Sequence, residues 1–178
     1  MKYVLLLRGI NVGGKNKVSM AELKDLISRL GYENVITYIN SGNILFDSTD
    51  NIDTVNVNIS QILNSYPFKI NKVILTKQEY LEELENLPMW WKDELYRKDV
   101  LFYSDDIDYS IIKERINNMP LNDENVHFGK RAIFWGKFNE KNYLKTSYHK
   151  LLMKESFYKS ITIRNARTFE KIAELLKH

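Results

Sequence analysis

The order of apolar segments constrains the fold of this chain most, because strand-like runs and amphipathic helical stretches alternate in one pattern that occurs twice. The first run, Tyr3–Leu7, is continuously apolar, as is typical of a strand that is central in its sheet or covered on both faces. Ser19-Met-Ala-Glu22 has the form of a capping box and predicts that a helix begins near Met20. Gly31 supplies its stop signal.

Two further apolar runs, Val35–Ile39 and Ile44–Phe46, flank the turn-forming residues Asn40–Asn43 and predict a hairpin. Helical spacing of apolar residues then continues from Ile52 to Tyr66, and Ile70–Leu75 has the character of a fourth strand. These segments complete a β-α-β-β-α-β unit of ferredoxin-like type.

The same order of elements returns after a second capping box, which starts at Thr76 and predicts a short connecting helix. The later segments are expected as a strand at 100–103, a helix at 111–119, a hairpin of 126–128 and 132–138, a helix at 143–152, a strand at 161–163 and a last helix at 169–176. We therefore predict an α+β fold of two tandem ferredoxin-like units with antiparallel sheets. Unit one is expected at 1–76, the linker helix and loop at 77–98, and unit two with the C-terminal helix at 99–178.

Composition excludes several kinds of chemistry. The chain has no cysteine, so it can hold no disulfide, thiolate zinc site or thiol nucleophile, and this fits a cytoplasmic protein. No apolar run reaches the ~20 residues that span a bilayer, so no membrane association is expected. The three histidines have no metal-binding spacing, and we predict no metal and no cofactor. Whether the protein is an enzyme does not follow from the sequence.

The segment Gly9-Ile-Asn-Val-Gly-Gly-Lys-Asn16 nearly matches a phosphate-binding P-loop and follows an apolar strand, as that motif requires. However, Asn16 stands where the motif needs a serine or threonine, and the expected helix starts only after Ser19. The following strands also form a hairpin, whereas P-loop folds are parallel. We therefore do not expect an NTPase.

A milder hypothesis remains for this glycine-rich loop. Arg8, Asn11, Lys15 and the glycine amides are predicted to bind a small anionic or polar ligand close to a helix start. The alternative is structural: the glycines serve a tight turn, Arg8 pairs with a carboxylate, and Lys15 is solvated.

Three stretches carry a resemblance to a known family. Tyr3–Lys15 and Tyr38-Ile-Asn-Ser-Gly-Asn43 resemble the bacterial domain of unknown function 1697 family, as does Thr162-Ile-Arg-Asn-Ala-Arg-Thr168 near the end. An aromatic residue commonly follows the asparagine in that family, whereas this chain has Ala166. The resemblance implies a pair of ferredoxin-like units and an uncharacterised function, so it carries over no catalytic residue. It suggests one constellation of ligand-binding residues: Arg8, Asn11, Gly13, Gly14, Ser41, Gly42, Asn43, Arg164 and Asn165.

A second interpretation is RNA binding. The segment 130–138 places basic and aromatic residues on one expected strand, as RNA-recognition modules do, although the register matches poorly. Residues 130–167 carry a net charge of +8 and residues 99–129 a net charge of −5, so the basic segment is alternatively neutralised by its acidic neighbour in the fold.

A third interpretation is a protein-interaction or homodimerisation module, because an open sheet can associate through its face or edge. Two remaining features have simpler explanations in packing and capping. Asp105, Asp106 and Asp108 are expected to cap a helix rather than bind a cation, and Trp90 and Trp91 are expected to pack in the core.

Overall fold

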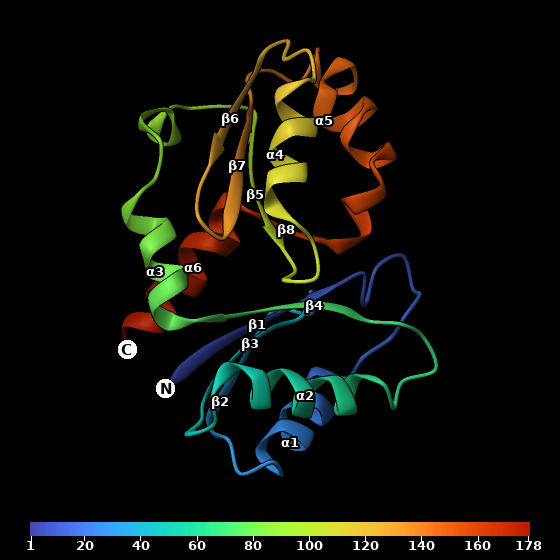
Figure 1. The fold of residues 1–178 in the computed structure, drawn as a ribbon, viewed down its shortest axis with the longest axis vertical. Coiled ribbons are helices and arrows are strands. Elements are labelled where there is room, and N and C mark those ends of the chain that lie inside the picture. The colour runs from blue at the N-terminus through green and yellow to red at the C-terminus, as the bar shows by residue number, and fades with distance from the viewer. The chain divides into compact units, whose positions relative to one another are not determined.

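The computed structural model describes residues 1–178, and Figure 1 shows its strands and helices. Contacts divide the chain into two compact units, Met1–Leu81 with Ile172–His178, and Glu82–Lys171. Each unit has its own four-stranded antiparallel sheet, and the two sheets are separate. The predicted α+β fold of tandem ferredoxin-like units is confirmed. No helix has the length and apolar character needed to cross a membrane.

The first unit follows the predicted order of elements. They are β1 (Lys2–Arg8), α1 (Met20–Ser28), β2 (Glu33–Tyr38), β3 (Asn43–Asp47), α2 (Ile52–Leu63), β4 (Asn71–Thr76) and α3 (Lys77–Glu85), which continues into the second unit. The strand order is β2-β3-β1-β4, so β1 pairs with β3 on one side and with β4 on the other. Tyr3–Leu7 is accordingly central and fully buried, as its unbroken apolar character predicted.

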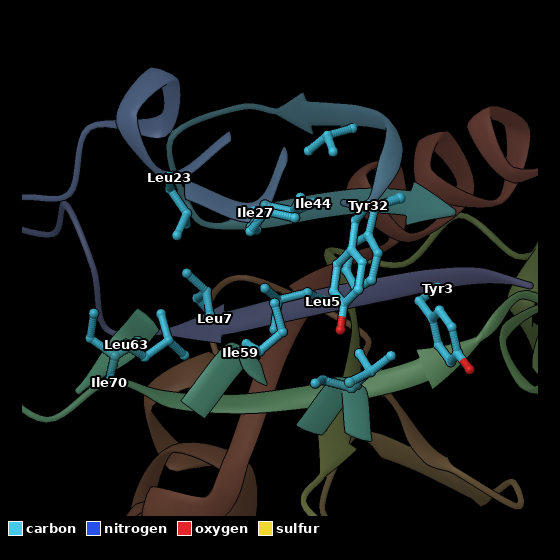
Figure 2. Close-up of a cluster of buried hydrophobic side chains, with 14 of the residues drawn as sticks. Tyr3, Leu5, Leu7, Leu23, Ile27, Tyr32, Ile44, Ile59, Leu63 and Ile70 are labelled. Carbon is cyan, nitrogen blue, oxygen red and sulfur yellow. The ribbon is translucent and has the colours of Figure 1, made fainter. Parts of the chain in front are cut away.

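Alternation along β1 directs Tyr3, Leu5 and Leu7 to the face that α1 and α2 cover. Figure 2 shows these side chains meeting Ile27 of α1 and Ile59 of α2 in one cluster. All five side chains are fully buried, so the core here has the close packing that fixes the positions of the helices. This packing holds α1 and α2 against one face of the first sheet.

The second unit repeats the pattern with more irregular connections. Its elements are η1 (Met89–Lys92), β5 (Arg97–Tyr103), α4 (Tyr109–Asn117), β6 (Glu124–Phe128), β7 (Ala132–Lys137), η2 (Tyr143–Lys145), α5 (Ser147–Lys150), η3 (Leu152–Lys154), η4 (Ser156–Ser160), β8 (Ile161–Asn165) and the first half of α6 (Ala166–Lys177), whose residues from Ile172 onward belong to the first unit. The strand order β6-β7-β5-β8 is equivalent to that of the first unit.

The single helix predicted at 143–152 is wrong. The chain instead forms three short turns there, because Thr146 is extended (φ −65°, ψ 151°) and starts a new turn as the N-cap of α5. The buried Glu124 accepts hydrogen bonds from the amides of Ser147 and Tyr148 at 2.9 Å each. A carboxylate distant in sequence thus holds the amide end of α5, and the local apolar spacing could not predict it.

Aromatic side chains cover the face of the second sheet that carries Phe134. Trp91 and Phe169 meet Phe134 edge to face, with ring centroids 5.4 Å and 5.7 Å apart. The indole nitrogen of Trp91 donates to Glu170 Oε1 at 2.9 Å, so its polar atom is satisfied. The prediction that Trp91 packs in the core is confirmed.

Gly42 allows the β2–β3 turn to approach β1. It has φ +87°, its carbonyl accepts from Leu7 N at 2.8 Å, and an added Cβ would lie 2.6 Å from Leu7 Cβ. We expect Gly42→Ala to lower the free energy of unfolding by more than the roughly 1–2 kcal/mol that the left-handed backbone alone costs. Urea unfolding measures this loss. Gly31→Ala is the matched control, because Gly31 has φ +84° with nothing near its Cβ, and an equal loss in both variants would contradict the steric account.

Candidate functional site

Asn11 connects three segments at one end of the first unit. Its side-chain nitrogen donates to Val18 O at 3.0 Å and to Asn40 O at 2.8 Å, and its side-chain oxygen accepts from Val18 N at 2.9 Å. The glycine-rich loop, the approach to α1 and the β2–β3 turn are therefore fixed to one another. Because the side-chain amide of Asn11 donates and accepts these hydrogen bonds within the protein, Asn11 positions the site and does not offer a free polar group to a ligand.

The loop itself closes as a small hairpin. Val12 and Lys15 form an isolated bridge, and Asn16 donates from its side chain to Gly9 O at 3.1 Å. Positive φ angles occur at five loop positions: Gly9, Asn11, Gly13, Gly14 and Asn16. Glycine and asparagine are the residues that adopt this conformation most readily, which explains their density here.

The predicted residues of the β2–β3 turn also have roles in folding. Asn43 is fully buried and donates from its side chain to Tyr38 O at 2.9 Å and to Ser41 Oγ at 3.1 Å. Gly42 provides the close approach to β1 described above. This turn forms one wall of the site, with Asn40 at its edge.

The open polar groups lie at the start of α1. Ser19 caps the helix by accepting from Glu22 N at 3.2 Å, and Leu23 N donates to Ser19 O at 3.0 Å. The N–H groups of Met20 and Ala21 have no acceptor within the protein. Met20 and Ala21 line a shallow hollow of about 630 Å³, which Asn11, Gly14, Lys17 and Asn40 also help to line.

The structure brings together only part of the predicted constellation. Of the predicted residues, Asn11 and Gly14 line the hollow. Gly13 and Lys15 are exposed nearby in the same loop, and Arg8 ends β1 opposite Asn71 of β4. Sequence reasoning missed Lys17 and the two helix amides, because backbone groups leave no side-chain signature.

Arg164 and Asn165 belong to the second unit, where they lie at the end of β8. Arg164 is 6% exposed and donates to Ile163 O at 2.9 Å. Asn165 Oδ1 accepts from Thr168 N at 2.8 Å, as a residue before a helix does, so the asparagine-threonine spacing starts α6.

A second hollow, of about 680 Å³, lies entirely within the second unit and contains a buried carboxylate that the sequence analysis overlooked. Glu83 is 2% exposed, and its Oε1 accepts from Arg131 N at 2.6 Å. The helical spacing could have predicted the burial of Glu83, because this residue follows Tyr80 by three positions and precedes Leu87 by four, which places all three on one face of a helix.

Burial raises the pKa of the Glu83 carboxyl, and the negative charge of Glu82 raises it further. The backbone amides of Arg131 and Lys130 and the positive charge of Arg131 oppose this increase in part. The folded protein therefore keeps a proton there that the unfolded chain releases above about pH 4.5. This contribution to stability is complete below that pH and is lost as the pH rises through the raised pKa. We expect Glu83→Gln to gain stability relative to wild type between pH 4.5 and pH 7, as measured by urea unfolding; a constant difference would contradict the assignment.

The aspartate cluster 105–108 behaves as predicted at one position. Asp108 is the N-cap of α4 and accepts from Ser110 Oγ at 2.7 Å and from Ser110 N at 2.9 Å, and these two hydrogen bonds lower the pKa of its carboxyl. Asp105 instead pairs with Arg131 at 2.5 Å. The protein has no group of three or more histidine, aspartate or glutamate side chains that could hold a metal ion.

Two of the three rings in the basic-aromatic segment 130–138 are buried, and the third, Phe138, is 40% exposed just beyond β7. Phe134 and Trp135 of β7 are both 0% exposed, and Trp135 donates from its indole to Glu124 Oε1 at 3.0 Å. Base stacking needs an accessible ring, so neither residue offers a stacking platform in this conformation. Lys137 is also buried and pairs with Asp99.

Comparisons with known proteins give a family without an activity. A family described as protein of unknown function (DUF1697) matches residues 1–134. The structure of a conserved bacterial protein from Streptococcus pneumoniae is similar, with 49% sequence identity, 98% of each chain covered and a TM-score of 0.93. No curated protein matches the chain.

Proposed function

The chain belongs to the DUF1697 family of proteins of unknown function, and on that premise we propose that it binds a small anionic ligand at the start of α1. The observation that carries the proposal is that Met20 and Ala21, whose amides have no acceptor within the protein, line this hollow. The ligand class is a small molecule that bears a phosphate or carboxylate group.

Helix geometry supports this choice of charge. The first amides of a helix point out of its end and carry the positive end of its dipole, so they attract and orient an anion. Lys17 lies at the rim and is exposed, and it adds a full positive charge to the same hollow. The backbone N–H of Glu22, the acidic residue of the first turn, already donates to Ser19 Oγ. The N–H groups of the two preceding residues therefore remain for a ligand.

Preorganisation is the second support. Asn11 ties the loop to Val18 and Asn40 by three hydrogen bonds, so the walls of the hollow are held before any ligand arrives. A ligand then loses little free energy in ordering the loop. This arrangement also explains why asparagine, with both a donor and an acceptor, is suited to position 11.

Thermal unfolding tests the proposal with inorganic phosphate, pyrophosphate, a sugar phosphate and a dicarboxylate. A ligand at about 100 times its Kd adds about 2.7 kcal/mol, which raises Tm by several degrees. Lys17→Glu should abolish the rise. Lys24→Glu is the matched control, because Lys24 is an exposed lysine of α1 that does not line the hollow, and it should keep most of the rise.

Two other results would redirect the interpretation. A salt-sensitive stabilisation by short RNA, unaffected by Lys17→Glu, would favour RNA binding through another surface. A Tm that rises with protein concentration and responds to no small molecule would favour self-association.

A further inference from the structure

The hollow around Glu83 is a built pocket of the second unit, separate from the proposed anion site in its residues and its charge. The end of α3, the start of α4 and the β6–β7 turn surround it, through Glu83, Tyr109 and Gly129 respectively. One of these three residues, Glu83, has a buried polar atom that makes no hydrogen bond within the protein.

That group is the second oxygen of Glu83. Oε1 accepts from Arg131 N at 2.6 Å, whereas Oε2 is buried and makes no hydrogen bond. A buried carboxylate oxygen without a partner is costly, so such an atom in a native fold calls for an explanation. One explanation is that a ligand bound in this pocket supplies the missing hydrogen-bond donor.

Gly129 makes room for this oxygen. A Cβ at position 129 would lie 1.9 Å from Glu83 Oε2, so only glycine is compatible with the observed carboxylate. Gly129 is itself fixed, because its N–H donates to Ala132 O at 2.8 Å and its carbonyl accepts from Tyr109 Oη at 2.7 Å. The turn therefore cannot move away easily, and the carboxylate keeps its place beside the pocket.

The other charges of the pocket already have partners. Lys130 pairs with Glu82 at 3.0 Å, and Lys113 Nζ lies 4.6 Å from the centre of the Tyr109 ring. The lysines are thus engaged, and Glu83 is the carboxylate that remains to be matched. A ligand that complements this pocket carries a positively charged donor.

Aromatic walls favour the same class of ligand. Tyr109, His127 and Phe128 line the pocket, and Tyr109 is stacked on Tyr103 with ring centroids 4.2 Å apart, which fixes its orientation. Tyr103 and Lys113 already contact the Tyr109 ring, so the half-buried rings of His127 and Phe128 are the ones that attract an organic cation and bury its apolar surface. We propose that this pocket binds an organic cation, a protonated primary amine carried on an apolar body, with its ammonium group donating to Glu83.

Phenethylammonium is a suitable probe, and 2-phenylethanol, which has the same body with a neutral hydroxyl, is its matched control. Titration would be followed by the amide NMR signals of Gly129 and Lys130 in the full chain. We expect saturable shifts with the amine and at least tenfold weaker binding of the alcohol, as the loss of one charge-assisted hydrogen bond implies.

Two variants locate the interaction. Glu83→Gln keeps an acceptor for Arg131 N but removes the charge, and it should weaken amine binding about tenfold or more. Glu82→Gln removes a carboxylate of the same pocket that already pairs with Lys130, and it should change binding less than about threefold.

Three outcomes would overturn the proposal: no saturable shift with the amine, equal binding of amine and alcohol by wild type, or unchanged amine binding in a folded Glu83→Gln. The comparison on wild type stands even if that variant fails to fold. Because the anion site is tested by Lys17→Glu and phosphate, either proposal can fail while the other holds.

Discussion

Replacing Lys137 by methionine is expected to lower the free energy of unfolding by about 3 kcal/mol, at the lower end of the ~3–5 kcal/mol cost of breaking a buried ion pair. Lys137 is 0% exposed, its Nζ lies 2.5 Å from Asp99 Oδ2, and Asp99 is 1% exposed. Burial lowers the pKa of Lys137 to about 8, so the ammonium is charged at pH 7. Methionine has similar length and would leave Asp99 buried with its remaining cation, Arg97, at 3.1 Å.

A double-mutant cycle separates the pair from its surroundings. Asp99→Leu combined with Lys137→Met should be more stable than Lys137→Met alone, because the uncompensated buried charge is then gone. Arg97→Ala is the matched control, since the Arg97 side chain is 46% exposed, and it should cost about 1 kcal/mol or less. Equal losses for Lys137→Met and Arg97→Ala in urea unfolding would contradict the assignment of Lys137 as the main partner of Asp99.

Replacing Glu124 by alanine is expected to cost about 3–5 kcal/mol, because it leaves several buried donors without an acceptor at about 1–3 kcal/mol each. The carboxylate accepts from the Trp135 indole at 3.0 Å, from Ser147 N and Tyr148 N at 2.9 Å, and from Asn122 N at 3.3 Å. Unfolding free energy measured by urea, with Trp135 fluorescence as a local probe, gives the size of the loss.

Glu124→Gln provides a graded comparison. Oε1 accepts hydrogen bonds from Trp135 and Tyr148, whereas Oε2 accepts from Ser147 and Asn122. The single side-chain oxygen of glutamine can therefore keep one of these pairs of hydrogen bonds and loses the other. Its loss should fall between wild type and alanine. If alanine and glutamine were both neutral, Glu124 would not hold the start of α5, and the break of the predicted helix would need another cause.

The elements that were predicted well are those with local signals. Thr76 and Glu79 form a reciprocal capping box, with Glu79 Oε2 accepting from Thr76 N at 2.8 Å and Thr76 Oγ1 accepting from Glu79 N at 3.2 Å. The unbroken apolar run Tyr3–Leu7 likewise predicted a central strand, and all five of its side chains are fully buried. Such features depend on residues within one turn or strand, so a single sequence contains them.

The features that were missed depend on contacts between distant residues. Lys137 appeared as part of a basic surface strand, yet it is buried against Asp99, 38 residues earlier. Glu83 was not predicted as a site residue, because its buried position depends on Gly129, 46 positions later, which gives its carboxylate room. The prediction that acidic neighbours neutralise the basic segment is confirmed where Arg131 meets Asp105 and Lys137 meets Asp99.

The candidate site was predicted in outline, since the glycine-rich loop and the Asn40–Asn43 turn do meet at Asn11. The sequence analysis expected the donors in the glycine-rich loop, whereas the amides without an acceptor are those of Met20 and Ala21 at the start of α1. Their availability follows from where Ser19 caps α1, which the capping box indicated, and from the hollow above them, which only the folded chain reveals.

The most direct test of the anion-binding account is a phosphate titration followed by the amide NMR signals of α1. The account predicts saturable shifts that are largest for Met20 and Ala21, small for Leu23, and absent in Lys17→Glu. Shifts that do not saturate, or that spread evenly over exposed lysines without favouring the two amides, would contradict it.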